Sequence, residues 1–122
     1  MKIRIRGNAV RFRLTKTEVE TFSNTGLYEE KTVFGTKVFT YALRASNEHH
    51  DLYAEFVEDT IVMYLPSEAS EGWAESKKVG FSRTLVLDNG QELSLLLEKD
   101  FVCLDETIED QSDNYPNPRA AQ

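Results

Sequence analysis

The sequence predicts an α+β domain that is mainly antiparallel β, with about eight strands in one strongly bent or barrel-like sheet and two short helices near residues 15–25 and 66–76. Apolar and polar residues alternate on both sides of two tight-turn signals, and Thr, Val, Phe and Tyr are frequent between residues 27 and 65. Nearly all connections are short, which favours antiparallel neighbours, and bending or closing a sheet hides its edges. Two helices are too few to supply the crossovers of a parallel α/β sheet.

A hairpin followed by a helix opens the chain. Isoleucines, then Val, Phe and Leu, alternate with arginines over residues 2–14, and Gly7-Asn8 between them is typical of a two-residue hairpin turn. Thr15 and Glu18 have the spacing of a capping box, so a helix begins there and ends before Gly26.

The remaining elements follow the same signals. Four strands are predicted between residues 27 and 65, with breaks at Gly35, at 46–51 and at 58–60. A second helix begins at Pro66 and carries Trp73 on its buried side. Asp88-Asn89-Gly90 then joins the two strands of a last hairpin. No repeat of 20 to 50 residues is evident, although the elements run in a loose mirror order.

Length and composition limit the classes of protein to which this chain can belong. A chain of 122 residues with 40% apolar and 11% aromatic residues is the size and kind of one globular domain, here residues 1–104 with an acidic C-terminal tail, 105–122, docked on it. One cysteine and two histidines exclude internal disulfides and the usual zinc sites. No apolar run would span a bilayer and no secretion signal opens the chain, so we expect a cytoplasmic protein. A net charge of −7 argues against nucleic-acid or membrane binding.

The arginines of the first hairpin are the main functional signal. With a turn at Gly7-Asn8, Arg4 lies opposite Arg11 and Lys2 opposite Arg13, all on one face. Like charges placed directly opposite destabilise a sheet by a few tenths to about 1 kcal/mol per pair. We therefore expect anions nearby. The predicted anion- or partner-binding residues are Arg4, Arg6, Arg11, Arg13 and Lys16.

Two sources of negative charge compete for this face. One is internal: residues 98–113 hold seven acidic side chains and one lysine, and Glu92, Glu98, Glu55 and Glu58 are further carboxylates. The other is an anionic ligand or an acidic partner, which the planar guanidinium suits. The first alternative makes the face architectural, and the second makes it a binding site.

Catalytic and cofactor signatures are absent from the sequence. It contains no P-loop, GxGxxG, GxSxG or HExxH pattern, so no cofactor, catalytic residue or metal ligand is predicted. Asp105, Glu109, Asp110 and Asp113 lack the spacing of a calcium loop, and His49-His50 is interpreted as a loop pair. A small non-enzymatic binding or interaction module, monomeric or weakly dimeric, is the favoured function. The alternative is an enzyme or sensor for a small phosphorylated or carboxylated ligand.

The end of the tail is unusual for a free terminus. Tyr115 is a large anchor, and Pro116 and Pro118 reduce the conformational entropy lost on ordering. These three residues are predicted to fasten the tail to the domain or to form a peptide for a partner.

The stretches MKIRIRGNAVRFRLTKTEV, LLLEKDFVCLDE and SDNYPNP resemble a group of small single-domain bacterial proteins known as a domain of unknown function. This resemblance covers nearly the whole chain and implies one free-standing domain, without an activity, ligand or catalytic residue. Small barrels that hydrolyse triphosphates differ, because they open with alternating glutamates where this chain has Lys2, Arg4 and Arg6.

Overall fold

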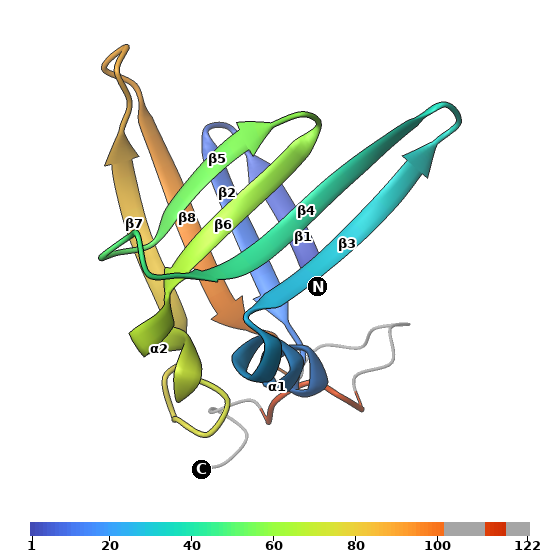
Figure 1. Ribbon diagram of the computed structural model, residues 1–122, viewed down its shortest axis with the longest axis vertical. Helices are drawn as coiled ribbons and strands as arrows, with labels where there is room; N and C mark the ends of the chain where they lie inside the picture. The colour runs from blue at the N-terminus through green and yellow to red at the C-terminus, as the bar shows by residue number, and fades with distance from the viewer. Residues whose placement is uncertain (102–111, 117–122) are drawn as a thin grey trace.

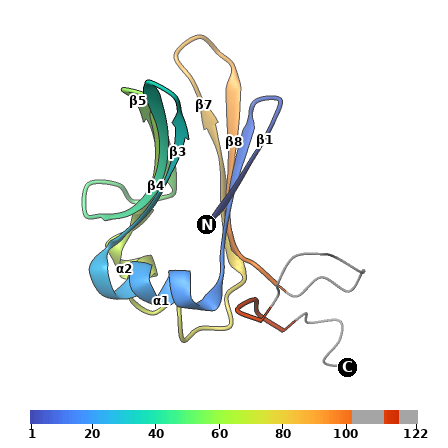
Figure 2. The same ribbon diagram turned by 90° about the vertical axis from the view of Figure 1, so that its right-hand side faces the viewer.

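The computed structural model describes residues 1–101 and 112–116 and shows two four-stranded sheets that face each other, with both helices at one end (Figures 1 and 2). The α+β class, the eight strands and the two helices are confirmed. The elements in chain order are β1 (Lys2–Arg6), β2 (Ala9–Leu14), α1 (Lys16–Thr25), β3 (Leu27–Phe34), β4 (Lys37–Ser46), β5 (Tyr53–Val57), β6 (Thr60–Pro66), α2 (Ser67–Glu71), β7 (Gly80–Val86) and β8 (Glu92–Lys99).

The prediction of a single bent or barrel-like sheet is wrong. One sheet has the order β1-β2-β8-β7 and the other β3-β4-β6-β5, and neither closes on itself. The hairpins are antiparallel as predicted, but the central pairs, β2 with β8 and β4 with β6, are parallel. Short loops fix the direction of strands only within a hairpin. Each central pair joins two hairpins from different parts of the chain, and an antiparallel partner is not required there.

The chain consists of two related halves. Residues 1–46 and 52–101 each run hairpin, helix, hairpin, and each half gives one hairpin to each sheet. Buried residues of the first half recur 51 positions later: Phe12 and Met63, Leu14 and Leu65, Phe22 and Trp73. The mirror order of the sequence is therefore a structural repeat with pseudo-two-fold symmetry. Few identical residues mark it, because only the burial pattern is shared.

Local signals account for the first hairpin and helix. Gly7 has φ of 55°, which suits the tight turn. Thr15 caps α1, and its amide donates to Glu18 Oε1 at 2.9 Å, the bond expected of the capping box. The helix ends at Gly26, a left-handed C-cap.

The core lies between the sheets and against the helices. Its largest fully buried side chains are Trp73, Phe12 and Phe22, with leucines from both sheets around them. Trp73 is buried as predicted, but it lies two residues beyond the end of α2 rather than on the helix. The inner faces of both sheets are thus occupied by packing, so polar side chains that alternate with the core project outward.

Gly80 is expected to tolerate no side chain. A Cβ there would lie 2.8 Å from the Cα of Glu98 on β8 and would also meet the carbonyl oxygen of Leu97. We expect Gly80→Ala to lower the free energy of unfolding by about 1–3 kcal/mol, because the neighbouring backbone must shift. Gly72→Ala is the control, since a Cβ at Gly72 meets nothing within 4 Å. Urea denaturation of both variants checks this, and equal stability would contradict it.

Candidate anion-binding face

The outer face of the sheet β1-β2-β8-β7 carries the predicted arginines. Strand register places its outward side chains in three rows across the four strands. From the hairpin turn toward the helices, the rows are Arg6–Ala9–Ser94–Thr84, Arg4–Arg11–Leu96–Ser82 and Lys2–Arg13–Glu98–Gly80. The predicted register of the first hairpin is confirmed. We call Arg4, Arg6, Arg11 and Arg13 the arginine face.

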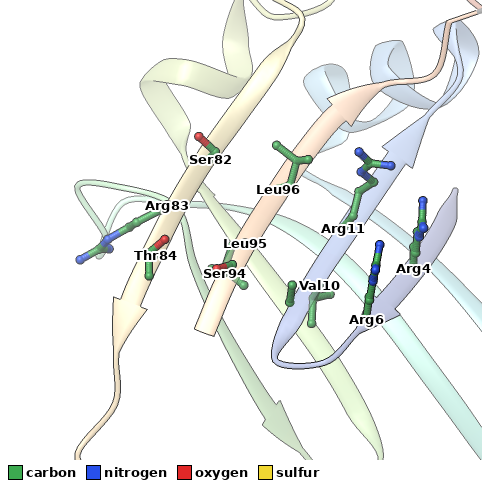
Figure 3. Close-up of a pocket in the computed structure, with 11 residues that line it drawn as sticks. Arg4, Arg6, Val10, Arg11, Ser82, Arg83, Thr84, Ser94, Leu95 and Leu96 are labelled. Carbon is green, nitrogen blue, oxygen red and sulfur yellow. The ribbon is translucent and has the colours of Figure 1, made fainter. Parts of the chain in front are cut away.

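A trough of about 500 Å³ lies over the first two rows. Arg4, Arg6 and Arg11 stand at one side and the hydroxyls of β7 and β8 at the other (Figure 3). The floor is low because Ala9 and Ser94 are short, whereas the arginines beside them are long. Arg83 touches the trough but points away from it, and its Nη1 donates to the carbonyl of Leu52 at 3.0 Å.

Carboxylates neutralise the row nearest the helices. Glu98 Oε1 lies 3.1 Å from Arg11 Nε and 3.3 Å from Arg13 Nε, so one carboxylate serves two arginines. Lys2 Nζ lies 3.1 Å from Asp100 Oδ2, a buried carboxylate at the end of β8. Of the carboxylates weighed from sequence that lie in residues 1–101 and 112–116, Glu98 is the one that forms ion pairs with the arginine face.

Arg4 and Arg6 differ from the other arginines of this face. Both side chains are exposed, and neither forms an ion pair with any residue in 1–101 or 112–116. Arg4 is opposite Arg11, whose Nε contacts Glu98. Charge compensation is therefore uneven: it is present beside the helices and, within the described residues, missing at the turn end where the trough lies.

The described part of the tail docks elsewhere, at the start of α1. Asp113 Oδ1 accepts from the Thr17 hydroxyl at 2.9 Å, and the Lys16 amide donates to the Asp113 carbonyl at 3.0 Å. The nearby Thr15 hydroxyl, hydrogen bonds from the hydroxyl and amide of Thr17, and the positive charge of Lys16 lower the pKa of Asp113. The contacts of Asp113 are therefore with the helix rather than with the arginine face.

Tyr115 lies among basic and aromatic side chains. Its ring packs on Phe101 with centroids 5.8 Å apart, and the ammonium groups of Lys99 and Lys16 lie 5.0 and 5.8 Å from its centre. Lys16 therefore belongs to the tail contact. Pro116 is exposed, while Pro118 and the acidic residues 105–110 lie outside the described residues.

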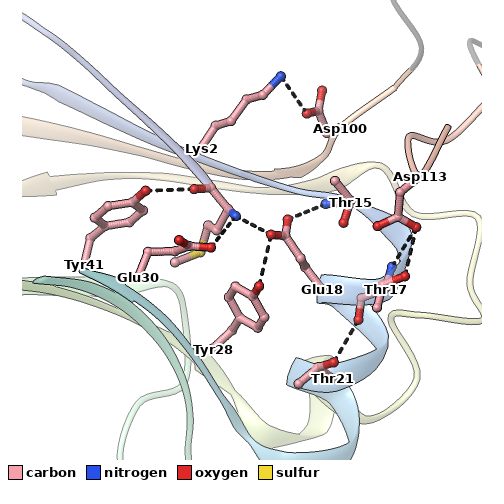
Figure 4. Close-up of polar contacts among 11 residues, drawn as sticks. Lys2, Thr15, Thr17, Glu18, Thr21, Tyr28, Glu30, Tyr41, Asp100 and Asp113 are labelled. Atoms are coloured by element: carbon pink, nitrogen blue, oxygen red, sulfur yellow. Dashed lines mark hydrogen bonds and ion pairs between the residues drawn. The ribbon is translucent and has the colours of Figure 1, made fainter. Parts of the chain in front are cut away.

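A second polar cluster lies between the sheets (Figure 4). The ammonium group of Met1 is ion-paired with Glu18 Oε2 and lies 3.0 Å from Glu30 Oε1. Tyr28 donates its hydroxyl to Glu18 at 3.1 Å, and Tyr41 donates to the carbonyl of Met1 at 2.9 Å. These groups satisfy one another, so the cluster joins the start of β1 to α1, β3 and β4.

The charges of this cluster determine two pKa values. Burial raises the pKa of Glu18, but hydrogen bonds from Met1, Thr15 and Tyr28, with the charge of the ammonium, outweigh it and hold the pKa below its ordinary value. Burial and the neighbouring Glu18 carboxylate raise the pKa of Tyr28 to about 12. At neutral pH, Glu18 is therefore ionised and Tyr28 keeps its proton.

Comparison with known families shows which family the chain belongs to. A family of unknown function, DUF7009, matches residues 1–119. The chain belongs to this family. The match confirms the resemblance found in the sequence. No curated protein and no solved structure matches this DUF7009 member.

The hydroxyl side of the trough was missed by sequence reasoning in this DUF7009 chain. The pairing of β8 with β2 brings three hydroxyl side chains into the same rows as the arginines: Ser82, Thr84 and Ser94. Their signal in the sequence is weak: they alternate with apolar residues in the last hairpin, which shows that they share a face but not which strand that face adjoins.

His49 also has a more defined place than a loop pair suggests. Its ring stacks on Tyr53 and Tyr64 with centroids 4.6 and 4.9 Å apart, and its Nδ1 lies 3.0 Å from the hydroxyl of Ser46. That hydroxyl also accepts from the amide of Glu48. These contacts hold the loop between β4 and β5 on its sheet.

Other classes of site gain no support from the described residues. Within residues 1–101 and 112–116, no three His, Cys, Asp or Glu side chains gather as metal ligands. Cys103, Asp105, Glu109 and Asp110 lie outside that part of the chain. None of the described helices is long and apolar enough to cross a membrane.

Proposed function

We propose that this protein is a non-enzymatic binding module that holds a small anionic ligand on its arginine face. The observation that carries the proposal is the pair Arg4 and Arg6, exposed at a trough and without an ion pair in the described residues. Guanidinium groups bind phosphate and carboxylate through paired hydrogen bonds, which gives such a ligand both affinity and orientation.

Electrostatics supports an anion at this place. The chain has 21 acidic and 14 basic residues, yet Arg4 faces Arg11 across the hairpin. Opposed like charges cost stability unless an anion lies between them, and Glu98 relieves only Arg11 and Arg13. A bound anion would relieve the repulsion between Arg4 and Arg11.

Protection of an open sheet edge is another reason for charge on β1, which is an edge strand. That role needs only the side chains of β1 itself. It gives no reason for a third arginine on β2 opposite Arg4, or for a hollow with hydroxyls on its far side. The volume of the trough favours a small ligand, since a protein partner would cover a much larger area.

The chemistry of the lining favours binding over catalysis. Arginine, serine, threonine and aliphatic side chains line the trough, and the carboxylate of Glu98, in the neighbouring row, is held by two arginines. A general base or nucleophile activated for catalysis needs a positioned proton acceptor beside the reacting group. Among the residues that line the trough, none has that role.

Replacing Arg4 and Arg6 together by Gln is expected to weaken anion binding at least tenfold without unfolding the protein. The probe is tripolyphosphate, added to the full chain at low ionic strength, where screening is weak. For the natural chain we expect a rise in Tm with probe concentration, and for the double variant affinity at least tenfold weaker, because charge-assisted hydrogen bonds are lost.

The matched control is Arg44→Gln. Arg44 is exposed on β4, in the other sheet, so the variant removes a positive charge far from the trough. We expect it to bind the probe like the natural chain. If no anion raises the Tm of the natural chain, or if Arg44→Gln weakens binding as much as the double variant, the proposed function is wrong.

A further inference from the structure

We infer that the ligand carries two anionic groups on a hydroxyl-bearing body, one group held between Arg4 and Arg11 and the other by Arg6, as in a sugar with two phosphates. This inference rests on the proposed function and goes further, because it names the class of ligand. It follows from how the arginines and the hydroxyls are distributed over the two rows of the trough.

The arginines provide two anion positions rather than one. Arg4 and Arg11 are direct partners across the hairpin, close enough to hold a single phosphate from two sides. Arg6 lies two residues further along β1, about 6.8 Å from Arg4 along the strand. Its partner across the hairpin is Ala9, so no second cation shares its anion. A ligand with one phosphate would leave either the pair or Arg6 unused.

The hydroxyl side indicates what joins the two anionic groups. Thr84 and Ser94 lie in the row of Arg6, and Ser82 lies in the row of Arg4 and Arg11. The sheet is three strand spacings wide from β1 to β7, so the backbones of the strands that carry Arg6 and Thr84 are about 14 Å apart. Neutral hydroxyls donate and accept, which suits the hydroxyls of a sugar better than it suits further phosphate oxygens.

Leu96 adds an apolar contact between the two sides. It lies in the middle row, between Arg11 and Ser82, and is partly exposed in the floor of the trough. The CH face of a sugar ring can rest on such a side chain while its hydroxyls reach the serines and the threonine. An inorganic polyphosphate held by the arginines would leave Leu96, Ser82 and Thr84 without a role.

The test compares two sugars that differ by one phosphate. Fructose 6-phosphate and fructose 1,6-bisphosphate are titrated into the full chain by calorimetry at low ionic strength. We expect the bisphosphate to bind at least tenfold more tightly, because the second phosphate gains the contact with Arg6. Arg6→Gln should remove that difference and leave the affinity for the monophosphate nearly unchanged.

A second variant separates the sugar from its phosphates. Thr84→Val keeps the shape of the side chain and removes its hydroxyl, so we expect weaker binding of the bisphosphate and unchanged binding of tripolyphosphate. Equal affinity for the two sugar phosphates, or a difference that survives in Arg6→Gln, would overturn the inference while the proposed function stands. If neither sugar phosphate nor tripolyphosphate binds the natural chain, the proposed function itself fails.

Discussion

Trp73→Ala is expected to lower the free energy of unfolding by about 3–5 kcal/mol, the usual cost of emptying a large aromatic site in a core. Trp73 is 1% exposed and packs edge-on against Phe81 with ring centroids 5.4 Å apart. Its indole Nε1 donates to the carbonyl of Lys78 at 3.0 Å. The side chain thus joins the turns after α2 to β7, and alanine would remove both the packing and the hydrogen bond.

Urea denaturation, followed by far-UV circular dichroism, measures this effect. Trp73→Phe is the control, because it keeps an aromatic ring but leaves the Lys78 carbonyl without this donor, and we expect it to cost less than half as much. A loss below about 1 kcal/mol for Trp73→Ala would mean that the segment after α2 contributes little to the core. Should Trp73→Ala fail to fold, Trp73→Phe still tests the hydrogen bond.

The sequence was sufficient for features that depend on neighbouring residues. The turn at Gly7-Asn8 and strict alternation determine the register of the first hairpin, so the position of Arg4 opposite Arg11 was predictable. The capping box at Thr15 and the last hairpin were predictable for the same reason. In each of these elements, the residues that decide the structure are close together in the chain.

Features that depend on distant residues were not predictable. Nothing within residues 9–14 specifies β8 as their neighbour, and this pairing alone brings Ser94 and Glu98 to the arginines. The repeat of the two halves is equally hidden, because Phe12 and Met63 share burial but not identity. The trough is made by that distant pairing, so the sequence predicts its cationic side and not its hydroxyl side.

Glu18→Gln is expected to destabilise the protein by about 2–3 kcal/mol at pH 7, because it removes one of the two carboxylates that compensate a buried positive charge. The Met1 ammonium lies between the sheets and contacts Glu18 and Glu30. Glu30 stays in the variant and is about a third exposed, so part of the compensation remains. Glutamine can still accept from the Thr15 amide, which preserves the cap of α1, but its amide nitrogen replaces Oε2 and cannot accept from the Met1 ammonium or the Tyr28 hydroxyl.

Glu20→Gln is the matched control, since Glu20 is an exposed residue of the same helix and the change in charge is identical. We expect it to alter stability by less than about 0.5 kcal/mol. The hydroxyl of Tyr28 supplies an independent measurement. Its pKa is raised to about 12, in part by the charge of Glu18, so alkaline titration of tyrosine absorbance should show a lower value in Glu18→Gln.

The dependence on pH follows from the sign of the shift at Glu18. Its pKa is lower in the folded protein than its ordinary value of 4.5, so the stabilisation is complete above that value and is lost as the pH falls through the folded pKa. We therefore expect the stability difference between the natural chain and Glu18→Gln to be constant near neutral pH and to shrink below about pH 4.5. Denaturation curves at several acidic pH values measure it. A difference that stays constant down to pH 2 would show that the loss comes from packing or hydrogen bonding, and that the charge of Glu18 does not stabilise this cluster.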